Sequence, residues 1–192
     1  MFRDQWKQEI FTIPNFLSLF RLLLIPVYMT VYLKAREPGD YYLAGSILAV
    51  SCLTDALDGM IARRFHSVTT LGKILDPLAD KITQFTLILC LSFRYNVLRP
   101  VLYLLVLKEL FQLVAGILSF RQGKMLSGAL PEGKVSTAVL FTTLILLVMF
   151  PNVSYATVRA IGAVDIFLLV IAFRSYLLAY LGYYPRMQSK TE

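Results

Sequence analysis

Apolar residues along this chain gather into six long runs that are separated by short polar stretches. Each run is close to the roughly 20 residues that a helix needs to cross the hydrocarbon core of a bilayer. The runs are too continuous for the alternating pattern of barrel strands, and within lipid only helices and closed barrels satisfy their backbone hydrogen bonds. The pattern therefore predicts an all-α integral membrane protein. Its six transmembrane helices are expected at about Phe16–Leu33, Tyr41–Ile61, Leu75–Phe93, Pro100–Phe120, Val135–Phe150 and Tyr155–Leu181.

The segment ahead of the first run has a different pattern. Residues 2–12 mix aromatic and charged side chains, and Phe2, Trp6 and Ile10 recur at helical spacing. This pattern predicts an N-terminal amphipathic helix that lies in the membrane interface. No short apolar stretch there ends in a small-residue cleavage site, so we expect no signal peptide. No linker or compositional shift divides the rest of the chain, which indicates a single transmembrane domain over residues 1–192.

The composition agrees with a membrane protein and argues against a soluble one. Hydrophobic residues make up 57% of the chain and charged residues 16%, with a mean hydropathy of +0.66. Soluble domains carry about 25% charged residues, and a globule of this size could not hide so many apolar side chains from water. The formal net charge of +7 comes from basic residues that flank the apolar runs. That placement favours membrane lipids as partners over nucleic acid.

The basic residues also indicate an orientation in a cell or inner membrane. Six helices place both termini on one side, and cytoplasmic loops are enriched in lysine and arginine. Both termini, the second-to-third loop and the fourth-to-fifth loop are therefore predicted to be cytoplasmic. The side richer in basic residues holds Arg3, Lys7, Arg21, Arg63, Arg64, Lys73, Arg121, Lys124, Lys134, Arg186 and Lys190, and the other side holds Lys34, Arg36, Arg94, Arg99 and Arg159.

Four aspartates stand at the junction of the second and third runs. Asp55 and Asp58 are three residues apart, and Asp76 and Asp80 are four apart, so each pair shares one face of its helix. A short hairpin makes the two helices antiparallel neighbours, which allows the four carboxylates to face one another at the cytoplasmic end. A single aspartate at the centre of a membrane helix costs about 2.5–3.5 kcal/mol, and less near the interface.

This cost, and the mutual repulsion of the carboxylates, require a cation or partial protonation. A cage of carboxylate oxygens suits hard divalent ions, so the sequence predicts a site for two ions of Mg²⁺ or Mn²⁺. A pair of such ions is a recurring device for displacement at phosphorus. Gly59 and Gly72 lack side chains and allow a diphosphate to approach closely, and Arg63 lies where phosphate oxygens need a charged donor.

Two other classes of protein also place charges inside the membrane. An ion-coupled transporter distributes them along a pathway, often with repeated halves, whereas these acids cluster at one end of one hairpin. An intramembrane aspartyl protease needs two aspartates that share a proton, not four with flanking glycine and arginine. Single charged residues near helix ends, such as Arg36 and Arg94, are interpreted as snorkelling anchors.

Residues 55–80 resemble the signature of the CDP-alcohol phosphatidyltransferase family, which reads D-x-x-D-G-x-x-A-R, eight residues, then G-x-x-x-D-x-x-x-D. The six-helix plan and the amphipathic N-terminal segment are also similar to the family. The resemblance implies transfer of a phosphatidyl group from CDP-diacylglycerol to an alcohol, with release of CMP. It also implies a homodimer. The chain matches each fixed position of the signature, at Asp55, Asp58, Gly59, Ala62, Arg63, Gly72, Asp76 and Asp80.

The resemblance implies a role for each of these residues. Asp55, Asp58 and Asp76 would bind the metal ions. Asp80 would complete the metal site and act as general base on the acceptor hydroxyl, so that positioning and charge neutralisation do most of the catalytic work. The residues expected to border the CDP moiety are Gly59, Ala62, Arg63 and Gly72.

Two further stretches bear on the acceptor. Ile13–Arg21 and Leu75–Lys81 resemble phosphatidylglycerophosphate synthases and the related cardiolipin synthases. Glycerol 3-phosphate, the acceptor of the first group, needs cations for its phosphate. The cytoplasmic side offers Arg121, Lys124 and Lys134, and positive-inside anchoring accounts for the same three residues equally well.

Two departures from the glycerophosphate-type pattern keep a second acceptor open. Lys108-Glu109 stands where such members commonly carry Arg-Glu, and Ser136 replaces the second lysine of a Gly-Lys-x-Lys-Thr stretch that begins at Gly133. The loss of that lysine weakens a phosphate pocket. We still expect glycerol 3-phosphate as the acceptor. The weakened pocket leaves phosphatidylglycerol, the acceptor of a cardiolipin synthase, as the alternative.

Two more charged residues lie deep within the predicted helices. Counting about 1.5 Å per residue from the external helix ends puts Lys108 and Asp165 near mid-membrane. We predict that they approach one another as a buried pair, the alternative being that each faces a polar cavity alone. Such a pair makes Lys108→Met destabilising and Asp165→Asn a partial rescue. His66, Cys52 and Cys90 lack the partners of a metal or disulfide site.

Overall fold

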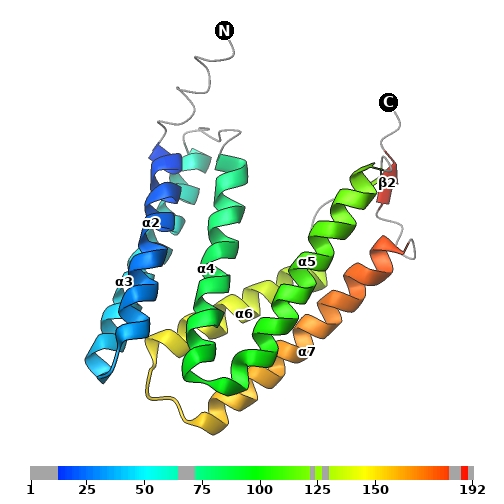
Figure 1. Cartoon of the computed structure of the whole chain (residues 1–192). Coiled ribbons are helices and arrows are strands. Elements are labelled where there is room, and N and C mark those ends of the chain that lie inside the picture. Colours follow the sequence, from blue (N-terminus) through cyan, green and yellow to red (C-terminus); the bar gives the residue numbers. More distant parts are fainter. Residues whose placement is uncertain (1–12, 65–71, 122–123, 127–129, 182–186, 190–192) are drawn as a thin grey trace. The chain divides into compact units, whose positions relative to one another are not determined.

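The computed structural model describes residues 13–64, 72–121, 124–126, 130–181 and 187–189 (Figure 1). Within these ranges, only the backbone is described at residues 13–15, 55–64, 72–76, 124–126 and 187–189. The interfacial helix predicted for residues 2–12 lies outside the described residues. The described elements are α2 Ile13–Lys34, α3 Pro38–Arg64, α4 Gly72–Arg94, the 3-10 turn η1 Asn96–Leu98, α5 Arg99–Arg121, β1 Lys124–Leu126, α6 Pro131–Met149, α7 Tyr155–Tyr180 and β2 Met187–Ser189.

The all-helical prediction is confirmed, because a helix forms at each of the six apolar runs. α3 and α4 have 27 and 23 residues, but they carry the four aspartates of the signature, which lower their mean hydropathy. Length and composition of the other helices indicate an integral membrane protein. The described segments that are long and apolar enough to cross a membrane are Phe16–Lys34, Asn96–Arg121, Pro131–Met149 and Tyr155–Tyr180.

Prolines shift two helix starts relative to the prediction. α3 begins at Pro38 rather than near Tyr41, because the first position of a helix has no use for the N–H that proline lacks. α6 begins with a proline for the same reason. The start of α3 is closed by Asp40, whose Oδ2 accepts hydrogen bonds from the backbone N–H groups of Arg36 at 2.9 Å and Glu37 at 3.2 Å.

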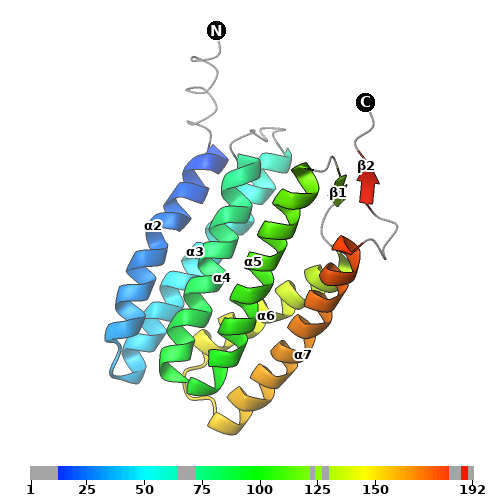
Figure 2. The same ribbon diagram turned by 45° about the vertical axis from the view of Figure 1, so that its right-hand side comes forward.

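The chain forms two compact units, and each is described by itself. Unit 1 contains the described residues of Met1–Leu91 and Ile145–Asn152. In it, α2, α3 and α4 run side by side (Figures 1 and 2). Leu48 of α3 and Leu87 of α4 are buried among them, as is the ring of Tyr28 on α2. These apolar contacts fix the helices that carry the signature.

Unit 2 contains the described residues of Ser92–Leu144 and Val153–Glu192. In it, α5 and α7 lie side by side (Figures 1 and 2). The ring of Phe111 on α5 packs edge-on against Phe173 and Tyr180 of α7, with centroid distances of 5.1 and 6.0 Å. Aromatic packing of this kind stabilises the pairing of the two helices.

The sequence does not predict the short antiparallel pairing of β1 with β2 in unit 2. This pairing joins Lys124 with Ser189 and Leu126 with Met187, and β1 also contacts α5. Strands of three residues are too short to show the alternation of apolar and polar positions that reveals a strand.

Candidate active site

The four aspartates of the signature belong to one end of unit 1. There α2 begins, α3 ends and α4 begins (Figures 1 and 2). Asp55 and Asp58 stand on the last turns of α3, and Asp76 and Asp80 on the first turns of α4, so the helical spacing predicted within each pair holds. The signature residues whose side chains lie outside the described residues are Asp55, Asp58, Gly59, Ala62, Arg63, Gly72 and Asp76.

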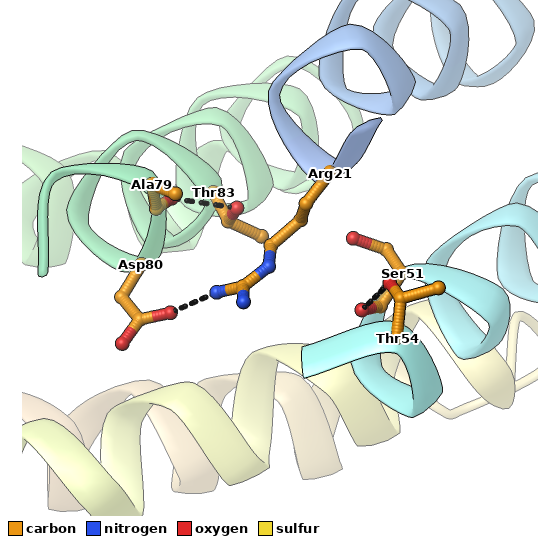
Figure 3. A network of polar contacts seen from close by, with 6 residues as sticks. All are labelled: Arg21, Ser51, Thr54, Ala79, Asp80 and Thr83. Carbon is orange, nitrogen blue, oxygen red and sulfur yellow. Dashed lines mark hydrogen bonds and ion pairs between the residues drawn. The ribbon is translucent and has the colours of Figure 1, made fainter. Parts of the chain in front are cut away.

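Asp80 is the signature aspartate whose side chain the structure describes. This side chain is 59% exposed, and its Oδ1 accepts a hydrogen bond from Arg21 Nη1 at 2.6 Å. The other carboxylate oxygen points away from the guanidinium (Figure 3). Arg21 comes from α2, lies 59 positions earlier in the chain and is buried. A carboxylate that is accessible to ligands is thus held from one side by a buried cation.

Small hydroxyl side chains flank this guanidinium (Figure 3). Ser51 and Thr54 lie on α3, and Thr83 lies on α4. The hydroxyl of Thr54 donates to the carbonyl of Ser51 at 2.7 Å, and that of Thr83 donates to the carbonyl of Ala79 at 2.8 Å. All three side chains are small, and those of Thr54 and Thr83 bond to their own helices, so they leave room for the arginine between α2, α3 and α4.

A small cavity continues from this cluster along the three helices. It is lined by apolar side chains of α2, α3 and α4 and by the hydroxyl-bearing residues Tyr28, Ser51, Thr83 and Thr86. Tyr28 is buried, and its hydroxyl has no hydrogen-bond partner among the described residues. Tyr28 lies seven residues after Arg21 on α2, so hydroxyl groups occur as far as about two helical turns beyond the arginine.

Sequence reasoning placed Arg21 on the basic cytoplasmic side and at the end of the Ile13–Arg21 stretch, but it gave this arginine no role and no partner. The signal that separates it from other basic residues is its position inside the apolar segment Phe16–Lys34. A charge within a membrane span is costly and commonly marks a functional group with a partner. The sequence could not name that partner, because Asp80 lies far along the chain on another helix.

The chemistry of Asp80 fits the divalent ions predicted for this site. Its carboxylate is a hard oxygen donor, and its exposure leaves it accessible to an ion. Among the residues whose side chains are described, no three His, Cys, Asp or Glu gather to hold a metal ion, and the other three signature aspartates do not belong to that set. The described part of the site thus contributes one carboxylate ligand.

The basic residues expected to hold an acceptor phosphate belong to unit 2. Arg121 at the end of α5 and Lys134 in the first turn of α6 are exposed, which suits both anion binding and membrane anchoring. Lys124 stands in β1, and its side chain lies outside the described residues.

The first turn of α6 is fixed by a buried tyrosine of α7. The hydroxyl of Tyr176 accepts a hydrogen bond from the backbone N–H of Leu130 at 3.3 Å. A Cβ atom at Gly133 would lie 2.5 Å from the same hydroxyl, so only glycine permits this close approach. Ser136 is buried and donates to the carbonyl of Gly133 at 3.4 Å. The residue that replaces the second lysine of the family pattern therefore faces its own helix.

The predicted pairing of Lys108 with Asp165 is wrong, although both side chains are buried. Lys108 Nζ forms an ion pair with Oε1 of the adjacent Glu109 at 2.7 Å. Asp165 Oδ2 accepts a hydrogen bond from the hydroxyl of Thr143 on α6 at 2.9 Å, and its Oδ1 has no partner among the described residues. Each charged group has found a closer partner than the one that depth in the membrane predicted.

The family resemblance extends well beyond the signature. The sequence model of CDP-alcohol phosphatidyltransferases matches residues 11–173, which is most of the chain. The chain belongs to the CDP-alcohol phosphatidyltransferase family. This match includes Arg21, Lys108 and Asp165 as well as the signature, so both units are parts of one family sequence.

Relatives within the CDP-alcohol phosphatidyltransferase family carry two kinds of name. A CDP-diacylglycerol–glycerol-3-phosphate 3-phosphatidyltransferase from Aquifex aeolicus is 36% identical over 137 residues, which cover 70% of this chain and 73% of that protein. The Bacillus subtilis protein of the same name is 42% identical over 84 residues, 38% of this chain and 44% of that protein. A probable cardiolipin synthase (CMP-forming) from Drosophila melanogaster is 36% identical over 111 residues, 57% of this chain. The chain spans 33% of that fly protein.

Proposed function

We propose that this protein transfers a phosphatidyl group from CDP-diacylglycerol to the hydroxyl of glycerol 3-phosphate and releases CMP. The observation that carries the proposal is the Asp80 carboxylate, which is exposed and held by Arg21 at the bundle end where α3 and α4 bear the whole signature. A held, accessible carboxylate, on a pair of helices that carries three further aspartates, suits phosphoryl-group transfer, in which positioning and charge stabilisation do most of the work.

Asp80 acts as the general base in this proposal. The acceptor oxygen attacks the lipid-side phosphorus of CDP-diacylglycerol, and its proton passes to the Asp80 carboxylate. The bond between that phosphorus and the bridging oxygen breaks, and CMP leaves with the bridging oxygen. In this proposal, Gly59, Ala62 and Arg63 near the end of α3 and Gly72 at the start of α4 border the CDP moiety.

Asp55, Asp58, Asp76 and Asp80 are proposed to hold two divalent ions, Mg²⁺ or Mn²⁺. When bound, these ions neutralise the diphosphate and stabilise the departing CMP. The support is the chemistry of the ligands, since carboxylate oxygens are the donors that such ions prefer. The spacing of each pair along a continuous helix gives it one face, which suits a shared site.

The proposal includes a placement in the membrane. All six helices span the bilayer of a cell or inner membrane, and the segment before α2 forms an interfacial helix. The positive-inside distribution of lysine and arginine supports a cytoplasmic active site. There CDP-diacylglycerol enters from the lipid and the polar acceptor from water. Two copies are expected to form a homodimer, each a single domain over residues 1–192.

Glycerol 3-phosphate is the acceptor that we propose first. The exposed Arg121 and Lys134, together with Lys124, offer cations for its phosphate. Relatives named for this acceptor include the Aquifex protein, which matches 70% of the chain.

Phosphatidylglycerol is the second candidate acceptor, and one observation favours it. Ser136, which replaces the second lysine of the glycerophosphate-type pattern, is buried and bonds to its own helix. The first turns of α6 therefore present one lysine fewer to an incoming phosphate. With this acceptor the product is cardiolipin, as in the name of the Drosophila relative.

The test is release of CMP from CDP-diacylglycerol by the purified protein in detergent with Mg²⁺ or Mn²⁺. Parallel reactions contain glycerol 3-phosphate, phosphatidylglycerol or inositol phosphate. We expect release with glycerol 3-phosphate, loss of release in chelator, and a fall of about 10²- to 10⁴-fold in Asp80→Asn, the range that a general base contributes.

Asp40→Asn is the matched control, because Asp40 is an aspartate of α3 at the end opposite the signature. We expect it to keep the wild-type rate. Release with phosphatidylglycerol alone would favour the cardiolipin reaction. Release that persists in chelator, or full activity in Asp80→Asn, would contradict the mechanism, and no release with any acceptor would contradict the proposed reaction.

A further inference from the structure

Arg21 and Asp80 form an ion pair whose two members differ sharply in exposure. The side chain of Arg21 is 3% exposed and that of Asp80 is 59% exposed. Withdrawing a guanidinium from water is costly, so the position of Arg21 is set by its packing between three helices. An exposed aspartate has several rotamers open to it. Arg21 is therefore the fixed member of the pair, and Asp80 is the member that it fixes.

We propose that Arg21 is a positioning residue, which holds the Asp80 carboxylate in the orientation that accepts the proton of the acceptor hydroxyl. The inference rests on the role proposed above for Asp80. The guanidinium binds Oδ1 at 2.6 Å, and the second oxygen points away from it (Figure 3). The two oxygens thus have separate tasks, because one anchors the side chain and the other takes the proton.

A base in this position needs an anchor for a geometric reason. Proton transfer requires the two heavy atoms to approach within about 2.6–3.2 Å, and a misplacement of about 1 Å can lower a rate roughly 100-fold. Arginine suits the task because its planar guanidinium presents donors in a rigid fork, whereas lysine offers a mobile point charge. Ser51 of α3 and Thr83 of α4 are buried near the arginine side chain (Figure 3).

The experiment compares Arg21→Met, Arg21→Lys, Asp80→Asn and the double variant Arg21→Met/Asp80→Asn. Arg36→Met is the matched control, since Arg36 is exposed between α2 and α3. We expect Arg21→Met to lower kcat by about 10- to 100-fold, with the KM for CDP-diacylglycerol changed less than about threefold. Arg21→Lys should recover part of the loss, and Arg36→Met should retain the wild-type kcat.

The double variant shows whether Arg21 acts through Asp80. In the Asp80→Asn background, Arg21→Met should cause no further fall in kcat, since the group that it positions is gone. The melting temperature of the metal-free protein is the second readout. Its changes in the two single variants should be non-additive as well, because the ion pair is broken by either substitution.

Several outcomes would overturn the inference. A lower melting temperature with wild-type kcat would make Arg21 purely structural, and an equal loss of kcat in both backgrounds would mean that it acts on another group. If Arg21→Met does not fold, wild-type kcat in Arg21→Lys would exclude the geometric role. Full kcat in Asp80→Asn would contradict the assignment of Asp80 as general base. A fall in kcat in Asp80→Asn together with wild-type kcat in Arg21→Met would contradict only the positioning role of Arg21.

Discussion

Buried charge is treated differently in the two units of the molecule. In unit 1, Arg21 on α2 reaches Asp80 on α4, and the carboxylate remains accessible from outside. In unit 2, Lys108 pairs with the adjacent Glu109, and Asp165 takes a hydroxyl from Thr143. An ion pair between distant segments fixes one helix against another, whereas a pair between chain neighbours adds no tertiary constraint.

This difference indicates a catalytic role for the charged groups of unit 1 and a structural role for those of unit 2. A charge held in place with an accessible partner, as in unit 1, is available to a substrate. In unit 2, Lys108 is buried and paired with its neighbour in the chain, and Asp165 is buried with one hydrogen bond, from Thr143, so neither side chain is accessible to a substrate. We therefore expect substitutions in unit 2 to change stability without changing the chemical step. Two substitutions in unit 2 test this, and a third, milder one concerns an aspartate of unit 1 that lies away from the signature.

Gly133→Ala should be the most destabilising of the three. The added Cβ would lie 2.5 Å from the hydroxyl of Tyr176 and 2.6 Å from its ring. Because that ring is buried and hydrogen-bonded to Leu130, it has little room to give way. The free energy of unfolding should fall by about 3 kcal/mol, the upper part of the usual range for overpacking. The measurement is the thermal melting of the purified protein in detergent.

Gly116→Ala is the matched control for this substitution. Its Cβ would meet the Tyr180 hydroxyl at 3.6 Å, an ordinary contact, and alanine is the better helix former by about 1 kcal/mol. Gly116→Ala should therefore melt at the wild-type temperature or above it. Similar melting temperatures for both variants would show that the close approach of Tyr176 to Gly133 does not occur in solution.

Thr143→Val should come next. It removes the hydroxyl that donates to Asp165 at 2.9 Å and leaves that carboxylate buried without its donor. The expected loss of stability is about 1–3 kcal/mol, with kcat unchanged for the molecules that remain folded. Thr142→Val is the control, because Thr142 is exposed and its hydroxyl bonds to the backbone of Ala138 in the same helix.

The kcat of Thr143→Val tests whether substitutions in unit 2 leave the chemical step unchanged. A fall in kcat at unchanged stability would bring Asp165 into the catalytic machinery. The division of labour between the units would then be wrong.

The sequence predicted those features that depend on local order along the chain. Six apolar runs became six helices, and aspartates three and four residues apart stayed on continuous helices, because both features follow from helical periodicity. The bundle end that holds the signature also followed, since a short connection between α3 and α4 brings the end of one beside the start of the other.

The sequence did not predict which side chains contact one another between helices. Depth in the membrane suggested that Lys108 and Asp165 meet, but each found a nearer group, in the adjacent residue and on α6. The Arg21–Asp80 pair was missed for the converse reason, since nothing near either residue in the chain points to the other. A single sequence gives the depth of a charge along its helix, but the rotation of that helix decides which neighbour it meets.

The smallest effect concerns Asp40, at the end of α3 opposite the signature. Backbone N–H groups of Arg36 and Glu37 donate to its carboxylate, and these hydrogen bonds lower the pKa of Asp40 below its usual value. The ionised form is thus favoured by folding, so its stabilisation of the helix start is present above the ordinary aspartate pKa of about 3.9 and is lost as the pH falls through the lowered pKa.

An NMR titration of the Asp40 carboxyl carbon should show a midpoint below that of an unfolded peptide, and an equal or higher midpoint would mean that the capping bonds are absent in solution. Asp40→Asn should remove the titration and leave CMP release unchanged, because Asp40 lies at the end of α3 opposite the signature. Asp40, at the start of α3, would then have a purely structural role, in contrast to the metal-binding role proposed for Asp55 and Asp58 near the other end of the same helix.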